Sequence, residues 1–170
     1  MAILAVVKYP HKVLKAPCVP VENSEINQNL QSFLDDMITT MYADNGMGLA
    51  ANQVNVPKRI FIMDESPEQK QPIIFMNPEI MLQSEEMTED QEGCLSFPGI
   101  TLKIKRPKYI KMRALNREGE EFILEREDYS ARCLHHELDH LNGITFFDHL
   151  SALKRQLAEA KLKKYLRTTL

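Results

Sequence analysis

The most restrictive feature of this sequence is the run His136-Glu137-Leu138-Asp139-His140, which has the form H-E-x-x-H. On an α-helix, side chains four positions apart lie on one face. The imidazoles of His136 and His140 can therefore reach one metal ion while Glu137 stays beside it. The pattern requires a helix at this place in the chain, and we expect that helix to lie buried at the centre of the fold.

The spacing of apolar residues predicts two further helices. Between residues 26 and 42 the apolar positions recur every three or four residues, which indicates an amphipathic helix, and we expect Ser24 to cap it. A similar pattern begins after Ser151 and predicts a C-terminal helix. A helix in the N-terminal half and one at the C-terminus therefore frame the central helix.

Between these helices the sequence predicts β-strands. Apolar and polar residues alternate, or short β-prone runs occur, in the ranges 59–64, 72–76, 100–105, 110–114 and 122–124. Residues 3–7 form either an edge strand or an extended lead-in. We therefore expect a single α+β domain over residues 1–170, with mainly antiparallel strands around the central helix.

Composition excludes several classes of protein. The chain is 44% hydrophobic and 26% charged, as is ordinary for a globular domain, and its net charge of −3 argues against a general DNA or RNA binder. Cys18, Cys94 and Cys133 are too few and too scattered for a disulfide framework, which favours a reducing, cytoplasmic location. The apolar segment at residues 2–7 is short and is followed by Lys8 and Pro10. We therefore expect no signal peptide and no membrane span.

A catalytic zinc-type site usually needs a third protein ligand. The metzincin pattern would place a histidine at position 146, where the chain has Phe146. A thermolysin-like site would use a downstream glutamate, and Glu159 lies at a suitable distance from His140. A third candidate is Cys94, which follows a glycine in a polar turn and offers a thiolate suited to zinc or ferrous iron. The sequence favours Cys94 and leaves Glu159 open.

Three separate motifs occur in order along the chain. They read GMGLAANQ at residues 46–53, EGCLS at residues 92–96 and HELDH at residues 136–140. Together they resemble the three signature motifs of the bacterial-type peptide deformylase family. The similarity extends to the Tyr9-Pro10 segment and to the N-terminal-half and C-terminal helices, so it covers nearly the whole chain.

The resemblance implies a metal-dependent hydrolase that removes the formyl group from the N-terminal formylmethionine of nascent polypeptides and releases formate. It implies Cys94, His136 and His140 as the protein ligands, with water as the fourth, so that Cys133 is not a ligand. The family's native ion is Fe²⁺, one per chain, and Ni²⁺, Co²⁺ or Zn²⁺ can replace it. Glu137 would take a proton from the metal-bound water, which attacks the formyl carbon, and return it to the leaving amine.

Further roles follow from the same resemblance. The side-chain amide of Gln53 and the backbone N–H of Leu95 would stabilise the developing oxyanion. The backbone of Gly46, Met47 and Gly48 would pair with an extended substrate peptide.

The residues expected around the substrate's methionine side chain are Tyr129, Arg132 and Cys133. Arg132 stands where the family usually has apolar residues; its charge would either extend to solvent or narrow and polarise the pocket. Thr101 stands where many relatives carry an arginine that holds the peptide, which predicts weaker peptide binding or an altered preference. We assign His135 a structural polar role and no metal.

Residues next to the motifs, and the C-terminal helix, have separate predictions. Glu92 and Asp139 are expected to support the metal site. The C-terminal helix carries many cations and one acid, Glu159. This predicts either a solvated face or docking to ribosomal RNA near the emerging nascent chain, which the family resemblance supports.

Overall fold

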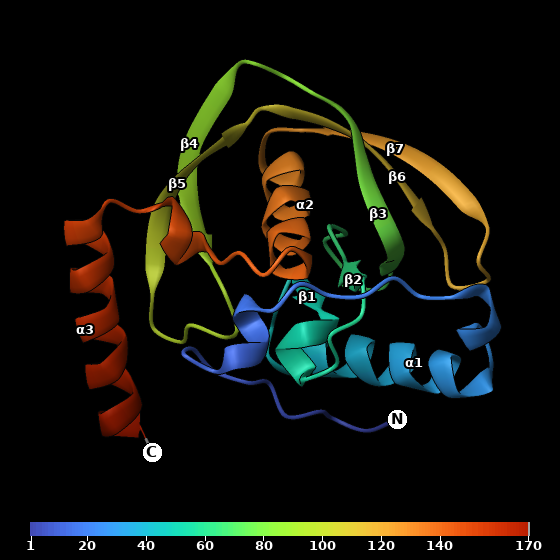
Figure 1. Cartoon of the computed structure of the whole chain (residues 1–170), viewed down its shortest axis with the longest axis horizontal. Helices are drawn as coiled ribbons and strands as arrows, with labels where there is room; N and C mark the ends of the chain where they lie inside the picture. The colour runs from blue at the N-terminus through green and yellow to red at the C-terminus, as the bar shows by residue number, and fades with distance from the viewer. Residues whose placement is uncertain (170) are drawn as a thin grey trace.

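The computed structural model describes residues 1–169 and confirms the α+β class (Figure 1). Within these residues the helices are α1 (Gln28–Ala43), α2 (Asp128–Leu141) and α3 (Ala152–Thr169). The strands are β1 (Gly48–Ala50), β2 (Ile60–Met63), β3 (Ile73–Gln83), β4 (Met87–Gly93), β5 (Thr101–Pro107), β6 (Tyr109–Leu115) and β7 (Glu121–Glu127). Short 3₁₀ turns connect several of them, including η3 (Ala51–Val54), which follows β1 directly.

All strand pairs within these sheets are antiparallel, as the sequence predicts. A five-stranded sheet has the order β1-β2-β3-β6-β7, and β4 and β5 form a separate two-stranded hairpin. The long strand β3 pairs with β6 as far as its last residue, Gln83, and the turn that follows leads into β4, so this turn joins the two sheets at the top of Figure 1. The curved sheet and the hairpin together enclose α2.

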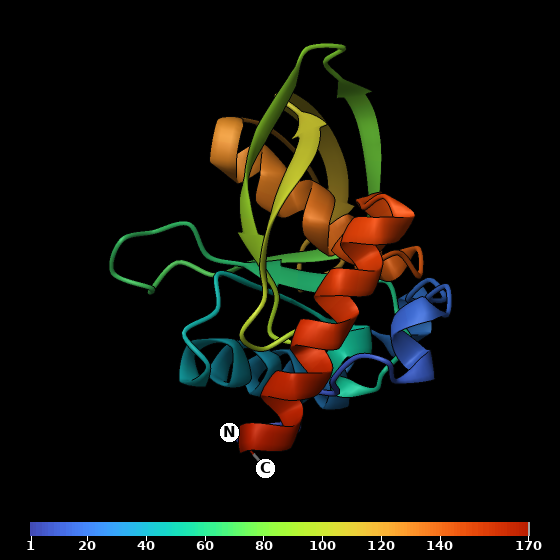
Figure 2. The ribbon, with the colours of Figure 1, turned by 90° about the vertical axis from the view of Figure 1, so that its left-hand side faces the viewer.

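Helix α2 lies at the centre of the molecule, as expected from the metal motif. Its apolar face carries Leu134, Leu138 and Leu141, which pack in one cluster with sheet residues that include Phe61 and Phe75. Figure 2 shows the β4–β5 hairpin between α2 behind it and α3 in front. The face of α2 that carries His136 and His140 is therefore directed towards the hairpin and β1.

Helix α1 confirms the predicted apolar stripe but not its cap. Leu34, Met37 and Met41 are completely buried. The side chain of Asn27 caps the helix by accepting a hydrogen bond from the Leu30 N–H at 3.1 Å. The prediction for Ser24 was wrong because the chain forms a separate 3₁₀ turn over Asn23–Glu25 before the helix begins.

The strand predictions succeed where one face is buried. Residues 3–7 form no strand and are an extended lead-in. Strand β4 and the second half of β3 were not predicted, because their side chains are mostly polar or exposed on both faces. These segments are held by backbone ladders, β4 with β5 and β3 with β6, which leave no apolar alternation to detect.

Asp64 organises the loop between β2 and β3. Its carboxylate accepts hydrogen bonds from the Tyr42 hydroxyl, from both the hydroxyl and the N–H of Ser66, and from the N–H of Gln71. Burial raises the pKa of this carboxyl, but the hydrogen bonds from Ser66 and Tyr42 outweigh burial and lower it below its ordinary value. The ionised form of Asp64 is therefore part of the folded loop.

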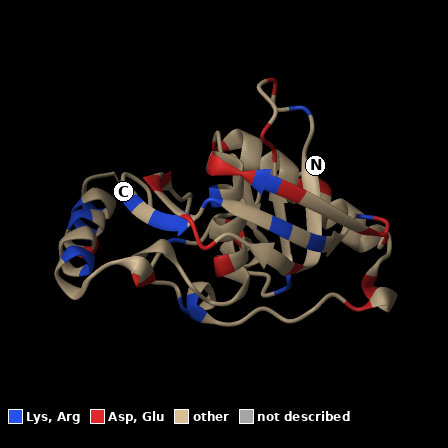
Figure 3. Ribbon diagram, turned by 90° about the horizontal axis from the view of Figure 1, so that it is seen from above, with Lys and Arg blue, Asp and Glu red and all other residues tan. Residues whose placement is uncertain are grey.

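Helix α3 packs beside the hairpin through Ala158 and Leu162, which belong to a cluster with Phe97 and Ile104. Several lysine and arginine residues lie along α3 (Figure 3), and Lys154, Lys161, Lys163, Lys164 and Arg167 are exposed. Among residues 1–169, no helix combines the length and apolar character that crossing a bilayer requires.

Candidate metal centre and active site

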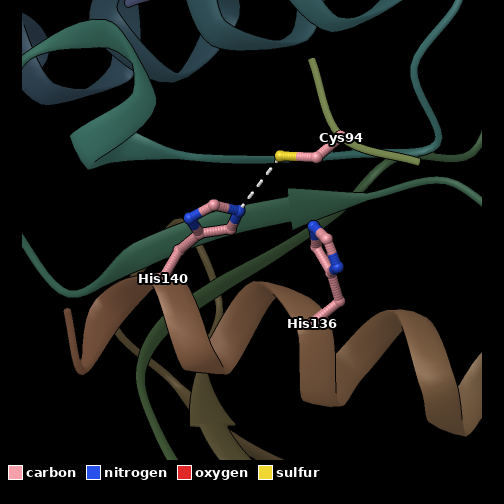
Figure 4. Close-up of side chains that lie close together, drawn as sticks. All are labelled: Cys94, His136 and His140. Carbon is pink, nitrogen blue, oxygen red and sulfur yellow. Dashed lines mark hydrogen bonds between the residues drawn. The ribbon is translucent and has the colours of Figure 1, made fainter. Parts of the chain in front are cut away.

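Cys94, His136 and His140 converge between the end of the hairpin and α2 (Figure 4). One potential ligand atom from each lies within 4.8 Å of the other two. The Cys94 Sγ and His140 Nε2 are 3.4 Å apart. Strand β4 delivers the cysteine just past its last residue, and one turn of α2 separates the histidines. Within residues 1–169 this is the one His/Cys/Asp/Glu group with ligand spacing.

The orientation of His136 suits a metal ligand. Its Nδ1 is 2.8 Å from Glu92 Oε1, so the carboxylate holds the ring and leaves Nε2 for an ion. Two nearby buried atoms, Glu137 Oε2 and His140 Nδ1, have no hydrogen-bond partner among the described residues. A thiolate with two imidazoles is a donor set that suits zinc or ferrous iron. The residues present therefore fit a divalent metal cofactor.

Glu92 joins the metal centre to a buried network of charges. Arg106 donates to both of its oxygens, at 2.8 and 2.9 Å, and Arg132 donates to Oε2 at 2.8 Å. Burial raises the pKa of Glu92, but Arg106 and His136 overcome that effect and hold it far below its ordinary value. Glu92 is therefore ionised and held in place on three sides.

Arg106 extends this network to a second acidic residue, Asp139 of α2. Its Nη1 donates to Asp139 Oδ2 at 2.6 Å, and the same oxygen is 2.7 Å from His149 Nε2. Arg106 itself is 3% exposed. The supporting positions expected for Glu92 and Asp139 are thus joined by one buried guanidinium, a link that no local sequence signal indicated.

Arg132 is buried, and the prediction that its charge extends to solvent was wrong. The residue is 2% exposed. Besides Glu92, its guanidinium donates to Ile104 O at 2.5 Å and Thr88 O at 2.8 Å. Burial is possible because a carboxylate and two carbonyls take over from water. Arg132 lines the cavity, but its charge is already satisfied by protein groups.

Gln53 and Leu95, the two predicted oxyanion donors, both lie next to Cys94. Gln53 is 1% exposed, and its Oε1 accepts from the Ala50 N–H at 2.9 Å. This contact turns Nε2 towards Cys94 Sγ, at 3.5 Å, and Ser96 Oγ, at 3.1 Å. Leu95 follows Cys94 in the turn after β4 and lines the adjoining cavity. The structure thus brings both predicted oxyanion donors beside the thiol.

A cavity of about 530 Å³ opens beside these residues. The predicted substrate residues Gly46, Met47, Gly48, Tyr129, Arg132 and Cys133 all line it. So do Gln53, Cys94, Leu95, His136 and Glu137. At Gly48 a Cβ atom would lie 2.6 Å from Glu137 Oε1, so glycine is required for this approach. The residues expected to bind the peptide therefore line the same cavity as the expected metal ligands Cys94 and His136 and the expected base Glu137.

Three side chains near the site have other roles. Burial raises the pKa of Cys133 to about 12, so it remains a thiol, and its Sγ donates to Met47 Sδ at 3.7 Å. His135 is buried, and burial lowers its pKa to about 4, so it is neutral. Glu159 accepts from the Tyr9 hydroxyl at 2.8 Å and from Arg155 at 3.2 Å. Neither His135 nor Glu159 belongs to the ligand group.

Burial is also the dominant influence on Glu137. Because the residue is 6% exposed, its carboxyl is poorly hydrated, and its pKa rises to about 7 although His136 opposes the change. The carboxyl adjoins the cavity beside the metal ligands. A buried carboxyl next to a cation site is the arrangement of a metal-dependent hydrolase, and this is the class that the fold and the donor set define.

Comparison with known proteins identifies the family. The polypeptide deformylase family model matches residues 3–156. The chain is 43% identical over 164 residues to a peptide deformylase from Saccharophagus degradans, an alignment that covers 96% of this chain and 94% of that protein. It is 45% identical over 167 residues to one from Phenylobacterium zucineum, covering 97% and 98%.

Solved structures agree with the sequence comparison. A crystal structure of a peptide deformylase from Legionella pneumophila superposes with a TM-score of 0.93 at 39% identity, covering 98% of this chain and 97% of that one. One from Ehrlichia chaffeensis in complex with actinonin gives 0.91 at 40% identity, covering 97% and 98%. The chain belongs to the polypeptide deformylase family. It is accordingly a hydrolase that acts on the N-formyl amide of formylmethionine.

Proposed function

We propose that this chain removes the formyl group from the N-terminal methionine of nascent polypeptides through Cys94, His136, His140 and Glu137. The observation that carries the proposal is the convergence of Cys94, His136 and His140 beside a cavity that Glu137 and Gln53 also line. A cavity of about 530 Å³ has room for a formylmethionyl group. Family membership supports the reaction, and the geometry of the site supports the residue roles.

Cys94, His136 and His140 would hold one Fe²⁺ ion, which Ni²⁺, Co²⁺ or Zn²⁺ can replace. Such an ion lowers the pKa of water and polarises a carbonyl oxygen. Glu92 supports the site by fixing the ring of His136. Because Arg106 and Arg132 fix Glu92 in turn, the ligand is oriented before any metal arrives.

Glu137 acts first as the general base and then as the general acid. Its carboxylate accepts a proton from the attacking water and delivers it to the methionine nitrogen as the formyl C–N bond breaks. Formate and a free amino terminus are the products. The unpaired, buried Oε2 of Glu137 is the atom that we assign to this transfer.

Gln53 and Leu95 act on the formyl oxygen. The negative charge that develops there meets the Nε2–H of Gln53 and the N–H of Leu95. The Ala50 contact to Gln53 Oε1 fixes which end of the amide faces the reaction. Donors held in this way need no reorganisation when the charge appears.

The substrate's methionine would enter the side of the cavity formed by Tyr129, Cys133 and the stem of Arg132. Backbone groups of residues 46–48 would pair with the peptide. Since the Arg132 charge is bound by Glu92, the pocket surface is less polar than the sequence indicates. Comparing formyl-Met with formyl-polar peptides on wild type and Arg132→Leu tests this assignment, and identical profiles would remove Arg132 from the pocket.

The central test is formate release from a formyl-Met peptide by protein purified without oxygen, because a ferrous site oxidises in air. Cys94→Ala should lose both metal and activity. Glu159→Ala should keep both, since Glu159 contacts Tyr9 and Arg155 instead of the ligands. Metal loss from Glu159→Ala, or full activity of Cys94→Ala, would contradict the assignment.

We also propose that the protein works in the cytoplasm, where nascent chains emerge, and that α3 docks on the ribosome. The exposed cations of α3 support docking by the attraction of lysine and arginine for phosphate. Co-sedimentation with ribosomes should weaken with salt and in a Lys161→Glu, Lys164→Glu variant. Unchanged co-sedimentation of that variant would exclude docking through α3.

A further inference from the structure

The segment of residues 7–9 lies against both loops that carry the proposed oxyanion donors. The Val7 N–H donates to Gln53 O at 2.8 Å. The Tyr9 N–H donates to Ser96 O at 3.0 Å. One short piece of the N-terminal lead-in is therefore bonded to the backbone of η3 and to that of the turn after β4.

Lys8, between these two residues, binds the centre of that turn. The Phe97 N–H donates to Cys94 O at 2.9 Å, which closes a β-turn over residues 94–97. Lys8 Nζ donates to Leu95 O, the carbonyl of the central peptide, at 2.9 Å. Types I and II of such a turn differ by about 150° in ψ at the second residue, so their central carbonyls point to opposite sides. The ammonium holds the carbonyl on one side.

We propose that Lys8 is a positioning residue for the oxyanion site: by fixing the Leu95 carbonyl it restricts the Leu95–Ser96 peptide, and with it both the Ser96 hydroxyl that Gln53 contacts and the turn that carries the Leu95 N–H. The kinetic part of this inference rests on the proposed function, whereas the hold on the turn does not. Among the described residues, Leu95 O is the one hydrogen-bond partner of the Lys8 ammonium. Lys8 is exposed, so water screens its charge, and the importance of the contact is that it fixes the direction of the carbonyl.

The second donor is coupled to the same turn. Gln53 Nε2 donates to Ser96 Oγ at 3.1 Å, and Ser96 is the residue that follows the held carbonyl. Ser96 is completely buried, so a change of its backbone conformation would move the hydroxyl that Gln53 contacts. Loss of the Lys8 contact should therefore disturb both donors together.

Lys8 also lines the cavity, so the competing role is direct contact with the peptide. The two roles predict different kinetics. A residue that positions oxyanion donors acts in the transition state and changes kcat, whereas one that binds peptide equally in both states changes KM. The distinction allows one set of variants to decide between them.

The experiment compares Lys8→Met, Lys8→Arg and the control Lys12→Met, each loaded with metal. Lys12 is an exposed lysine of the neighbouring turn η1 (Lys12–Lys15). Removing a whole oxyanion donor costs about 10²–10³ in kcat, so loosening one should lower kcat about ten-fold in Lys8→Met. KM should stay within about two-fold, because peptide contacts are untouched. Lys8→Arg should restore most of the rate, and Lys12→Met should match wild type.

A second readout does not depend on turnover. In zinc-loaded protein, amide hydrogen exchange of Phe97 and Tyr9, whose N–H groups close the turn and bind it, should be several-fold faster in Lys8→Met than in Lys12→Met. Unchanged exchange would overturn the inference, as would a raised KM at constant kcat. If wild type released no formate, the proposed function would fail, and exchange would still decide whether Lys8 holds the turn.

Discussion

Replacing Glu92 by glutamine removes the negative charge shared by Arg106, Arg132 and His136. Glu92 is 4% exposed, so water cannot take its place. Asp139 would be the one remaining acidic group in contact with Arg106, and Arg132 would keep its carbonyl partners. Breaking a buried ion pair of this kind costs about 3–5 kcal/mol in the free energy of unfolding.

The metal should be affected separately. Loss of the carboxylate behind a ligand histidine typically lowers metal affinity about 10–100-fold. Each factor of ten is about 1.4 kcal/mol, so the extra stability that saturating metal gives the folded state should shrink by about 1.4–2.8 kcal/mol. Two different losses are thus expected from the one substitution at Glu92.

Urea unfolding with and without a chelator separates the two losses. In metal-free protein, the difference in the free energy of unfolding between wild type and Glu92→Gln measures the contribution of the charge network. The extra stability that metal adds, compared between the same two proteins, measures the loss of metal affinity. Glu89→Gln is the matched control, since Glu89 lies on the same strand but is exposed. If Glu92→Gln changed metal-free stability by less than about 1 kcal/mol, the expectation from buried pairing would be refuted.

Three further outcomes are expected. Glu137→Gln should retain metal but lower kcat about 10²–10⁴-fold, and formate release alongside metal analysis checks this. Gly48→Ala should lower kcat at least ten-fold with an unchanged circular dichroism spectrum, because its Cβ would lie 2.6 Å from Glu137 Oε1 and displace it; normal turnover would show that the carboxylate position is not critical. Since the pKa of Asp64 is lowered in the folded state, the stability it adds is present above about pH 4 and is lost as pH falls through the folded value. The advantage of wild type over Asp64→Asn in urea should therefore narrow between pH 7 and pH 3.

The sequence predicts those parts of the site that local spacing encodes. The helical positions of His136 and His140 follow from their separation. The glycine-containing turn favoured Cys94, and the resemblance of three motifs implied it as the third ligand. The structure brings these three together.

What the sequence does not predict depends on contacts between distant residues. Arg106 lies in an alternating strand, where an arginine normally reads as exposed, and only tertiary structure places it between Glu92 and Asp139. Arg132 was expected to reach solvent or polarise the pocket because its carboxylate partner lies 40 positions away. No sequence pattern indicated a role for Lys8 at the site, because its hydrogen-bond partner is a backbone carbonyl, which any residue would offer.

The division of the ligands between Cys94 on the hairpin and the histidines on α2 has a mechanical consequence. A two-stranded hairpin is marginal by itself, and β4–β5 has no further strand beside it among residues 1–169. An ion bound by Cys94, His136 and His140 would therefore connect two parts of the molecule that are otherwise joined mainly by packing and the Glu92 charges. Loss of the ion would loosen the hairpin first. Metal-free protein would therefore be more susceptible to proteolysis as well as inactive.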